Sequence, residues 1–185
     1  MSTEINPVVN IEEAEEQKTP SAPNRLKRVK LIVAYDGTNY HGWQVQPNGE
    51  TIEGVLNRTL SSLLGEKIIV TGASRTDAGV HSMGNVAVFD TKSRIPAEKI
   101  SYALNQRLPE DIVVQKSEEV PADFHPRHCD SRKTYEYRIL NREFPLPMYR
   151  NNTYFCYRKL DLEKMQQAAE YLRGEPVSYT HLRAH

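Results

Sequence analysis

The sequence predicts an α+β fold: a ferredoxin-like βαββαβ unit, followed by an incomplete second α/β unit. Two observations predict it. Between residues 26 and 120, strand patterns and helix patterns follow one another in the order βαββαβ, which is typical of an antiparallel sheet with both helices on one face. Beyond residue 121 the alternation begins again and stops near residue 175. At 185 residues the chain can form one good core, or one domain and part of another.

The first unit begins with an apolar run over residues 29–35, which predicts a buried strand. The long loop at 36–50 that follows is of a length that often carries function. Apolar residues at helical spacing then predict a helix from Thr51, its expected N-cap, to Leu64, with Gly65 as the stop.

The rest of this unit contains two more strands, a helix and a fourth strand. We expect the strands at 67–73 and 85–90, with a loop at 75–81 between them. Pro96 suits the first turn of a helix that ends near Arg107, and residues 112–116 complete the sheet.

The second unit is expected to start at residue 121. Alternating side chains over 132–140 predict a strand with one solvated side, and residues 153–157 a short strand. Asp161 is the expected N-cap of a helix that ends near Gly174. Too few strands remain to cover the apolar face of this helix, so we expect the part after Pro121 to be partly unfolded or prone to aggregation.

Composition narrows the class of protein. Residues 1–25 are acidic and contain three prolines, which predicts a disordered tail. The whole chain has 24 basic and 24 acidic residues; without the five acids and one lysine of residues 1–24, a mildly basic body of 23 and 19 remains, which is compatible with RNA. Two cysteines form no disulfide framework, and no apolar run reaches the roughly 18 residues of a membrane span. We expect a soluble, cytoplasmic protein.

The most informative motif is Arg75-Thr76-Asp77-Ala78-Gly79-Val80-His81. In an extended segment the side chains of Arg75 and Asp77 share one face, so the guanidinium can keep the carboxylate ionised and aim it. Such a carboxylate suits a nucleophile or a base. The small residues after it leave room for a bulky substrate.

This run is similar to the catalytic signature of the tRNA pseudouridine synthase A family. Two other stretches extend the resemblance: residues 35–46 (YDGTNYHGWQVQ), and residues 124–127 (FHPR) together with 131–138 (SRKTYEYR). The resemblance covers about residues 26–175, in the order of the family. It makes residues 26–120 the catalytic subdomain and 121–175 the start of a second subdomain.

The resemblance implies a function and roles for five residues. The expected reaction is isomerisation of uridine to pseudouridine at positions 38 to 40 of the tRNA anticodon stem-loop. Asp77 would be the catalytic residue and Tyr135 the residue that stacks on the substrate base. Arg75 would order Asp77 or Tyr135, with a phosphate contact as the lesser alternative. His81 would support the site, and Arg127 is a candidate for a phosphate contact. The implied partner is tRNA, bound by a homodimer when the protein is full length, with no role for DNA or a membrane.

The chemistry agrees with these residues. The reaction is redox-neutral and transfers no phosphate, so no cofactor or metal is expected, and the sequence has neither a P-loop nor a dinucleotide-binding fingerprint. One carboxylate suffices: it attacks C1′ or C6, or removes a proton from C2′, and the sequence leaves these routes open. The uridine must be flipped out of its stack and held, for which an aromatic platform is the usual device.

Three other interpretations of the sequence are less well supported by its residues. A ferredoxin-like sheet also carries non-catalytic RNA-binding modules, but the expected central strand at 85–90 lacks their aromatic pattern. A base-removing glycosylase would also need an aspartate and a flipped base, and would release uracil. His125, His128 and Cys129 form a poor set of zinc ligands, because they fall within five residues and no second cluster accompanies them.

Residues 176–185 fit neither the family nor the fold. They resemble translated adaptor sequence, and we expect them to be an artefact at the end of a truncated reading frame. The family continues beyond this point. The truncated chain is therefore expected to carry the catalytic signature, and it can be inactive.

Overall fold

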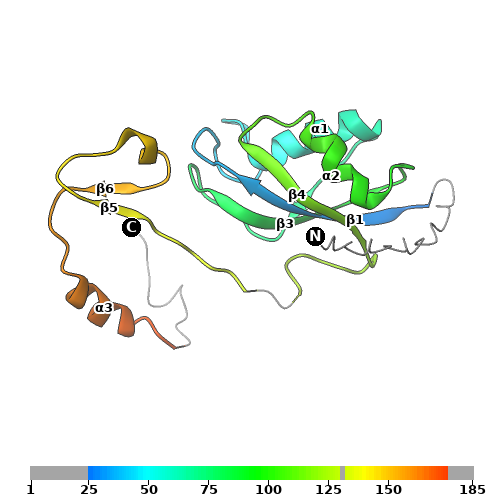
Figure 1. Ribbon diagram of the computed structural model, residues 1–185. Helices are drawn as coiled ribbons and strands as arrows, with labels where there is room; N and C mark the ends of the chain where they lie inside the picture. The colour runs from blue at the N-terminus through cyan, green and yellow to red at the C-terminus, as the bar shows by residue number, and fades with distance from the viewer. Residues whose placement is uncertain (1–24, 130–131, 175–185) are drawn as a thin grey trace, which may run out of the picture. The chain divides into compact units, whose positions relative to one another are not determined.

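A computed structural model describes residues 25–129 and 132–174 (Figure 1). The predicted features at residues 1–24 and 176–185 lie outside these ranges. The described residues divide into two compact units, 25–129 and 132–174. Among the described residues, no helix is both long enough and apolar enough to cross a membrane.

The first unit is a mixed α/β structure with a four-stranded antiparallel sheet. Its strands lie in the order β2-β3-β1-β4. In chain order its elements are β1 (Lys27–Tyr35), α1 (Ile52–Leu64), β2 (Thr71–Gly72), β3 (Ser82–Thr91), α2 (Ala97–Asn105) and β4 (Ile112–Val120). The predicted order of elements is therefore the observed one.

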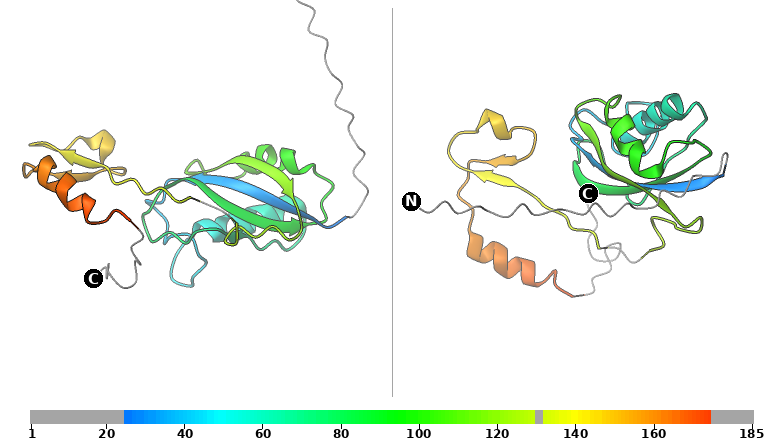
Figure 2. Two further views of the ribbon diagram at one scale, coloured as in Figure 1. Left: turned by 90° about the horizontal axis from the view of Figure 1, so that it is seen from below. Right: turned by 45° about the vertical axis from the view of Figure 1, so that its right-hand side comes forward.

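One face of the sheet carries the core. Every second residue of β1, from Val29 to Tyr35, is buried, and such residues point to the same side of a strand. The buried apolar residues of both helices belong to the same apolar cluster. Figure 2 shows both helices on this side of the sheet. Burial of this shared apolar area is the main force that holds the unit together.

Helix α1 begins and ends where the sequence predicts. The hydroxyl of Thr51 accepts a hydrogen bond from the backbone N–H of Gly54 at 3.2 Å. At the other end Gly65 has a φ of 69°, and its N–H donates to the Ser61 carbonyl at 3.0 Å. Both predicted caps are confirmed, because each depends only on residues next to it in the chain.

Strand β2 is much shorter than the predicted strand at 67–73. The backbone N–H of Ile68 donates to the Ser61 hydroxyl at 2.9 Å, and that of Val70 donates to Asn57 Oδ1 at 2.8 Å. Side chains of α1 thus take donors that a strand would offer to its neighbour. Residues 67–70 pack on the helix, and only Thr71–Gly72 pair with β3.

Residues 121–129 belong with the first unit, although the second was expected to start at 121. The Arg28 guanidinium donates to the Phe124 carbonyl at 3.1 Å, and the Lys30 ammonium lies 5.7 Å from the centre of the Phe124 ring. Arg127 Nε donates to the Gly72 carbonyl at 2.9 Å. These contacts attach the segment to β1 and β2, and the boundary between units falls after residue 130.

The second unit has a small parallel pair of strands and two helical segments. Its elements are β5 (Ile139–Asn141), the 3₁₀ helix η1 (Pro147–Tyr149), β6 (Tyr154–Cys156) and α3 (Leu162–Glu170). The predicted N-cap is confirmed, since Asp161 Oδ1 accepts from the Lys164 N–H at 3.1 Å. The strand predicted at 132–140 is wrong over 132–138, where no described strand pairs with the chain.

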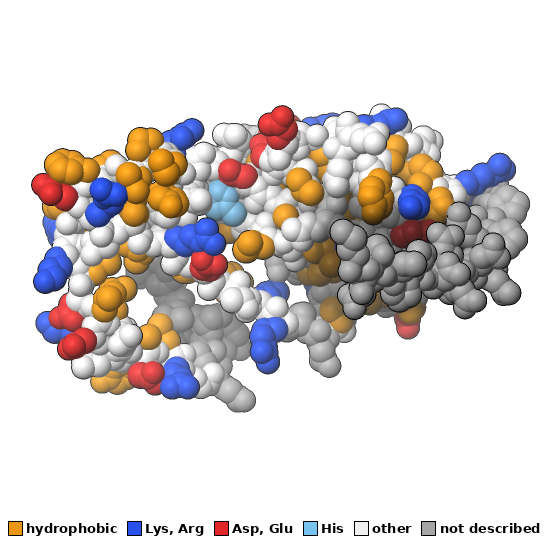
Figure 3. Space-filling model, in the orientation of Figure 1, with side chains coloured by type: hydrophobic (Ala, Val, Ile, Leu, Met, Phe, Trp, Pro, Cys, Tyr) orange, Lys and Arg blue, Asp and Glu red, His pale blue; other side chains and the backbone are white. Residues whose placement is uncertain are grey.

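Large hydrophobic side chains of this unit are exposed. Helix α3 has no buried residue. Figure 3 shows hydrophobic side chains on the surface of the unit, and the exposed ones include Tyr135, Tyr137, Phe144, Met148, Tyr154, Tyr157, Leu162, Met165, Tyr171 and Leu172. The apolar face of α3 is therefore uncovered among the described residues, as expected from the small number of strands; the expected aggregation or partial unfolding stays a prediction.

Trp43 gives a test of packing in the first unit. Its side chain is 1% exposed, and its indole Nε1 is a buried donor without a hydrogen-bond partner in the described structure. Trp43→Phe keeps most of the packing and removes this donor, so we expect a loss of less than about 1.5 kcal/mol in the free energy of unfolding. Trp43→Ala is expected to cost about 3–5 kcal/mol. Urea denaturation followed by circular dichroism measures both, and equal losses would contradict the account.

Candidate functional site

The motif with Asp77 lies on the loop between β2 and β3, and the start of this loop is fixed. The N–H of Ala73 donates to the Val86 carbonyl at 2.7 Å. The Ser74 N–H donates to Asn85 Oδ1 at 3.3 Å, and the Asn85 amide donates back to the Ser74 carbonyl at 3.1 Å. Asn85 is buried on β3, so the rigid sheet sets the direction in which the loop leaves it.

The middle of the loop is held on both sides of Asp77. On one side the Thr76 carbonyl accepts from the Trp43 N–H at 3.0 Å, and the Thr76 hydroxyl lies 2.9 Å from the hydroxyl of Tyr35. On the other side the Gly79 N–H donates to the Tyr40 carbonyl at 3.2 Å. All three partners come from the end of β1 or the loop at 36–50.

Two glycines of the 36–50 loop permit this close contact. A Cβ on Gly37 would lie 2.0 Å from the Val80 carbonyl oxygen, and one on Gly42 would lie 2.3 Å from the Thr76 carbonyl oxygen. Gly42 also has a φ of 82°, which glycine adopts without the strain of other residues. The long loop at 36–50, predicted to carry function, thus supports the Asp77 loop in this structure.

The 36–50 loop is itself anchored to α1. The Ile52 N–H donates to the Gly42 carbonyl at 3.2 Å, and the Glu53 N–H donates to the Trp43 carbonyl at 3.0 Å. These are donors of the first helical turn, which have no partner within the helix. Hydrogen bonds therefore connect α1 to the 36–50 loop, and the 36–50 loop to the Asp77 loop.

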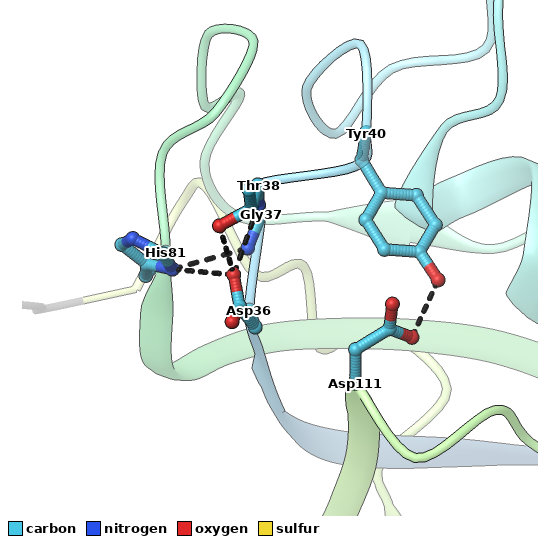
Figure 4. A network of polar contacts seen from close by, with 6 residues as sticks. All are labelled: Asp36, Gly37, Thr38, Tyr40, His81 and Asp111. Carbon is cyan, nitrogen blue, oxygen red and sulfur yellow. Dashed lines mark hydrogen bonds and ion pairs between the residues drawn. The ribbon is translucent and has the colours of Figure 1, made fainter. Parts of the chain in front are cut away.

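A polar network surrounds the end of the Asp77 loop (Figure 4). Asp36 Oδ1 accepts from the Thr38 N–H at 3.0 Å and from the Thr38 hydroxyl at 2.6 Å, and it lies 3.0 Å from His81 Nδ1. The hydrogen bonds from Thr38, with a smaller contribution from His81, lower the pKa of the Asp36 carboxyl. The same His81 Nδ1 lies 3.2 Å from the Gly37 nitrogen.

Asp111 completes this network on the side of β4. Its carboxylate accepts from the Tyr40 hydroxyl at 2.6 Å, and its carbonyl accepts from the Asp36 N–H at 2.9 Å. Burial of the phenol, together with the carboxylate beside it, raises the pKa of Tyr40 above its usual range. Tyr40 therefore stays a neutral donor at any physiological pH.

Arg75 and Asp77 are both exposed. No ion pair joins the two side chains among the described contacts, so the predicted orienting role of Arg75 toward Asp77 finds no direct contact here. The Asp77 carboxylate is open to solvent, while the backbone on both sides of it is fixed. Such a group is accessible to a large substrate.

The other predicted site residues divide between the two units. Arg127 lies in the first unit, where its guanidinium contacts Gly72, close in the chain to the start of the Asp77 loop. Tyr135 lies in the second unit with its side chain 79% exposed. Tyr137, two residues further along the chain, is 90% exposed.

The described residues do not support a zinc site at His125, His128 and Cys129. The rings of His125 and His128 stack with their centres 4.2 Å apart, and Cys129 Sγ donates to the Pro126 carbonyl at 3.6 Å. Desolvation and the neighbouring His128 and Arg127 lower the pKa of His125. The described part of the chain holds no group of three metal-ligating side chains suited to an ion.

Sequence reasoning missed the residues that support Asp77. The contacts of Asp36, Thr38 and Asp111 around the Asp77 loop were not predicted from the sequence. One signal was present: an aspartate with a threonine two residues later is typical of a turn in which the side chain accepts from the backbone. The long-range partners of this turn carry no signal in the sequence.

Comparison with known proteins agrees with the motif. The family described as tRNA pseudouridine synthase matches residues 31–128. The tRNA pseudouridine synthase A of Acetivibrio thermocellus is 51% identical over 149 residues, 80% of this chain and 61% of the relative. That of Ruminiclostridium cellulolyticum is 48% identical over 150 residues, 81% of this chain and 61% of the relative.

A third relative, tRNA pseudouridine synthase A 2 of Clostridium perfringens, is 45% identical over 150 residues, 81% of this chain and 62% of the relative. The chain thus spans about 61% of the length of the first two relatives. The family match includes the whole Asp77 loop, the 36–50 loop that supports it and most of the sheet that carries both. This chain therefore belongs to the tRNA pseudouridine synthase family.

Proposed function

We propose that this protein isomerises uridine to pseudouridine in tRNA and that Asp77 starts the reaction. One observation carries the proposal: an exposed carboxylate on a loop whose backbone is fixed on both sides. The family supplies the reaction and the substrate class. The chain spans about 61% of the length of its relative from Acetivibrio thermocellus, so isomerase activity in this chain is itself part of what we propose.

The reaction places few demands on the protein. The bond between C1′ and N1 of uridine breaks, the base turns, and C1′ joins C5; the hydrogen of C5 leaves to solvent and N1 gains one, so the mass of the RNA is unchanged. Asp77 can serve as nucleophile at C1′ or C6, or as base at C2′. A carboxylate held in one place performs any of these steps better than a mobile one, since less orientation has to be gained on binding.

The finer parts of the proposal concern scaffold and substrate. The strand order β2-β3-β1-β4 with both helices on one face supports a ferredoxin-like arrangement. Tyr135 would stack on the flipped uridine, Arg127 and Arg75 would face the RNA backbone, and His81 would support the loop. The anticodon stem-loop, at positions 38 to 40, would be the target, and a homodimer would bind it.

The test is isomerase activity on tRNA that carries uridine tritiated at C5. Besides the 185-residue chain, the assay uses a chimera in which the matched region is joined to the remaining part of the Acetivibrio thermocellus relative. We expect the chimera to release tritium and form pseudouridine without free uracil. Free uracil would indicate a glycosylase, and binding without tritium release from the chimera would favour a non-catalytic RNA-binding module.

The two tyrosines of the second unit separate a stacking role from a packing role. Tyr135→Ala in the chimera is expected to lower the rate by about 5- to 150-fold, the equivalent of 1–3 kcal/mol of base stacking. Tyr137, which is also exposed, is the matched control, and Tyr137→Ala should have a smaller effect. A larger loss at Tyr137 would contradict the assignment. Tyr135→Phe keeps the ring, so a comparable loss there would give the role to the hydroxyl.

A further inference from the structure

Asp36 and His81 meet where two loops leave the sheet. Asp36 follows the last residue of β1, and His81 precedes the first residue of β3. These terminal residues, Tyr35 and Ser82, are register partners in the antiparallel pair. A hydrogen bond between Asp36 and His81 therefore joins the end of the Asp77 loop to the end of β1, whereas Asn85 anchors the start of this loop.

Asp36 is held in place by contacts other than the one with His81. Thr38 donates to Oδ1 twice, from its N–H and from its hydroxyl, and the Asp36 N–H donates to the Asp111 carbonyl. Both the backbone and the side chain of Asp36 are thus held by partners outside the Asp77 loop. The carboxylate is a preformed acceptor that faces this loop (Figure 4).

His81 Nδ1 has two neighbours that make opposite demands. Asp36 Oδ1, at 3.0 Å, requires a proton on Nδ1, whereas the Gly37 N–H, at 3.2 Å, requires a lone pair there. One nitrogen cannot donate and accept at once. The contact with the carboxylate is the shorter and is charge-assisted, and such bonds are about twice as strong as neutral ones. The unprotonated alternative would also place the lone pair of Nδ1 against an anionic oxygen.

We propose that Asp36 and His81 are a positioning pair for the isomerisation. In this pair His81 Nδ1 is protonated and donates a hydrogen bond to Asp36 Oδ1, which holds the Asp77 loop in place. This inference rests on the proposed function for its effect on catalysis, but not for its effect on the loop. Neither residue touches the substrate in this role. Both act through the position of Asp77.

Substitutions of His81 can identify the nitrogen. In His81→Asn the amide nitrogen stands at the same number of bonds from Cβ as Nδ1, and in His81→Gln it stands at the place of Nε2. The first variant keeps a donor toward Asp36 and the second loses it. Asp36→Ala removes the acceptor. Asp90→Asn is the matched control, because Asp90 forms an ion pair with Arg28 at 2.7 Å between the same two strands at their other end.

Two measurements are made on each variant. The first is amide hydrogen exchange, in the 185-residue chain, at Gly79 and Val80, whose N–H groups are bonded within or next to the loop. The second is the rate of isomerisation and the Kd for tRNA, in the chimera. In His81→Gln and Asp36→Ala we expect exchange about fivefold faster and kcat about fivefold lower, the equivalent of about 1 kcal/mol for a half-exposed hydrogen bond to a carboxylate. The Kd should change less than about twofold, and His81→Asn and Asp90→Asn should behave like the unmodified chain.

Each contrary result has a distinct meaning. If His81→Gln is unaffected while His81→Asn is impaired, the role belongs to the other nitrogen and the proposal is wrong. Unchanged exchange in Asp36→Ala also overturns it, as does faster exchange with an unchanged kcat. If the unmodified chimera has no activity, the proposed function fails, and the exchange measurements still decide whether the pair holds the loop.

Discussion

Asp77→Asn is expected to lower the rate of tRNA uridine isomerisation by at least about 100-fold, the smaller end of what a positioned general base or nucleophile contributes. The amide has the shape of the carboxylate but is neither a nucleophile nor a base at neutral pH. Its side chain is exposed, so the free energy of unfolding should stay within about 0.5 kcal/mol. Tritium release in the chimera and a filter-binding Kd for tRNA are the measurements.

Asp123→Asn is the matched control for this variant. It removes the same charge from another exposed position of the first unit, so a general effect of charge on RNA binding would appear in both variants. We expect Asp77→Asn to bind tRNA as tightly as the control does. A rate within tenfold of the unmodified protein would remove Asp77 from its role, whichever of the three chemical routes is used.

The elements that sequence could predict are those decided by near neighbours in the chain. Thr51 and Gly65 mark the ends of α1 because a cap needs only the next few residues. The alternation of β1 predicts its buried face for the same reason. The order of elements in the first unit follows from these local patterns.

The errors arose where a distant partner decided the structure. Residues 67–70 have a good strand pattern, but Ser61 and Asn57 of α1 take their backbone donors. The segment at 132–138 alternates as a strand does, yet no described strand pairs with it, and alternation alone cannot supply a neighbour. Segment 121–129 looked like the start of a new unit because its contacts with β1 and β2 are long-range.

The candidate site shows the same division. The motif located the Asp77 loop, because its seven residues are contiguous. The residues that hold this loop, directly or through one another, come from four places in the chain: the end of β1, the 36–50 loop, the turn before β4, where Asp111 lies, and β3, where Asn85 lies. Only the turn at Asp36 and Thr38 is local, and it was the one part of the support that the sequence could have shown.

Gly42→Ala is expected to destabilise the first unit by about 3 kcal/mol or more. Two costs add. A residue with a Cβ loses roughly 1–2 kcal/mol in the left-handed conformation that Gly42 adopts, with a φ of 82°. The new Cβ would also lie 2.3 Å from the Thr76 carbonyl oxygen, so the two loops must separate. The separation breaks the hydrogen bond from the Trp43 N–H to that oxygen, which costs about another 1 kcal/mol. The strain of moving the loops apart adds to this cost.

Gly65→Ala separates the two costs. Gly65 also has a positive φ, 69°, but a Cβ there would meet nothing within 4 Å. Only the conformational cost applies, so we expect a loss of about 1–2 kcal/mol. Urea denaturation followed by the fluorescence of Trp43 reports on the first unit alone, since the sequence contains one tryptophan and it is buried in that core. In the chimera, Gly42→Ala should also lower the isomerisation rate, because Thr76 adjoins Asp77, whereas Gly65→Ala should not. Equal losses of stability, or an unchanged rate in Gly42→Ala, would mean that the contact between the two loops does not position the carboxylate.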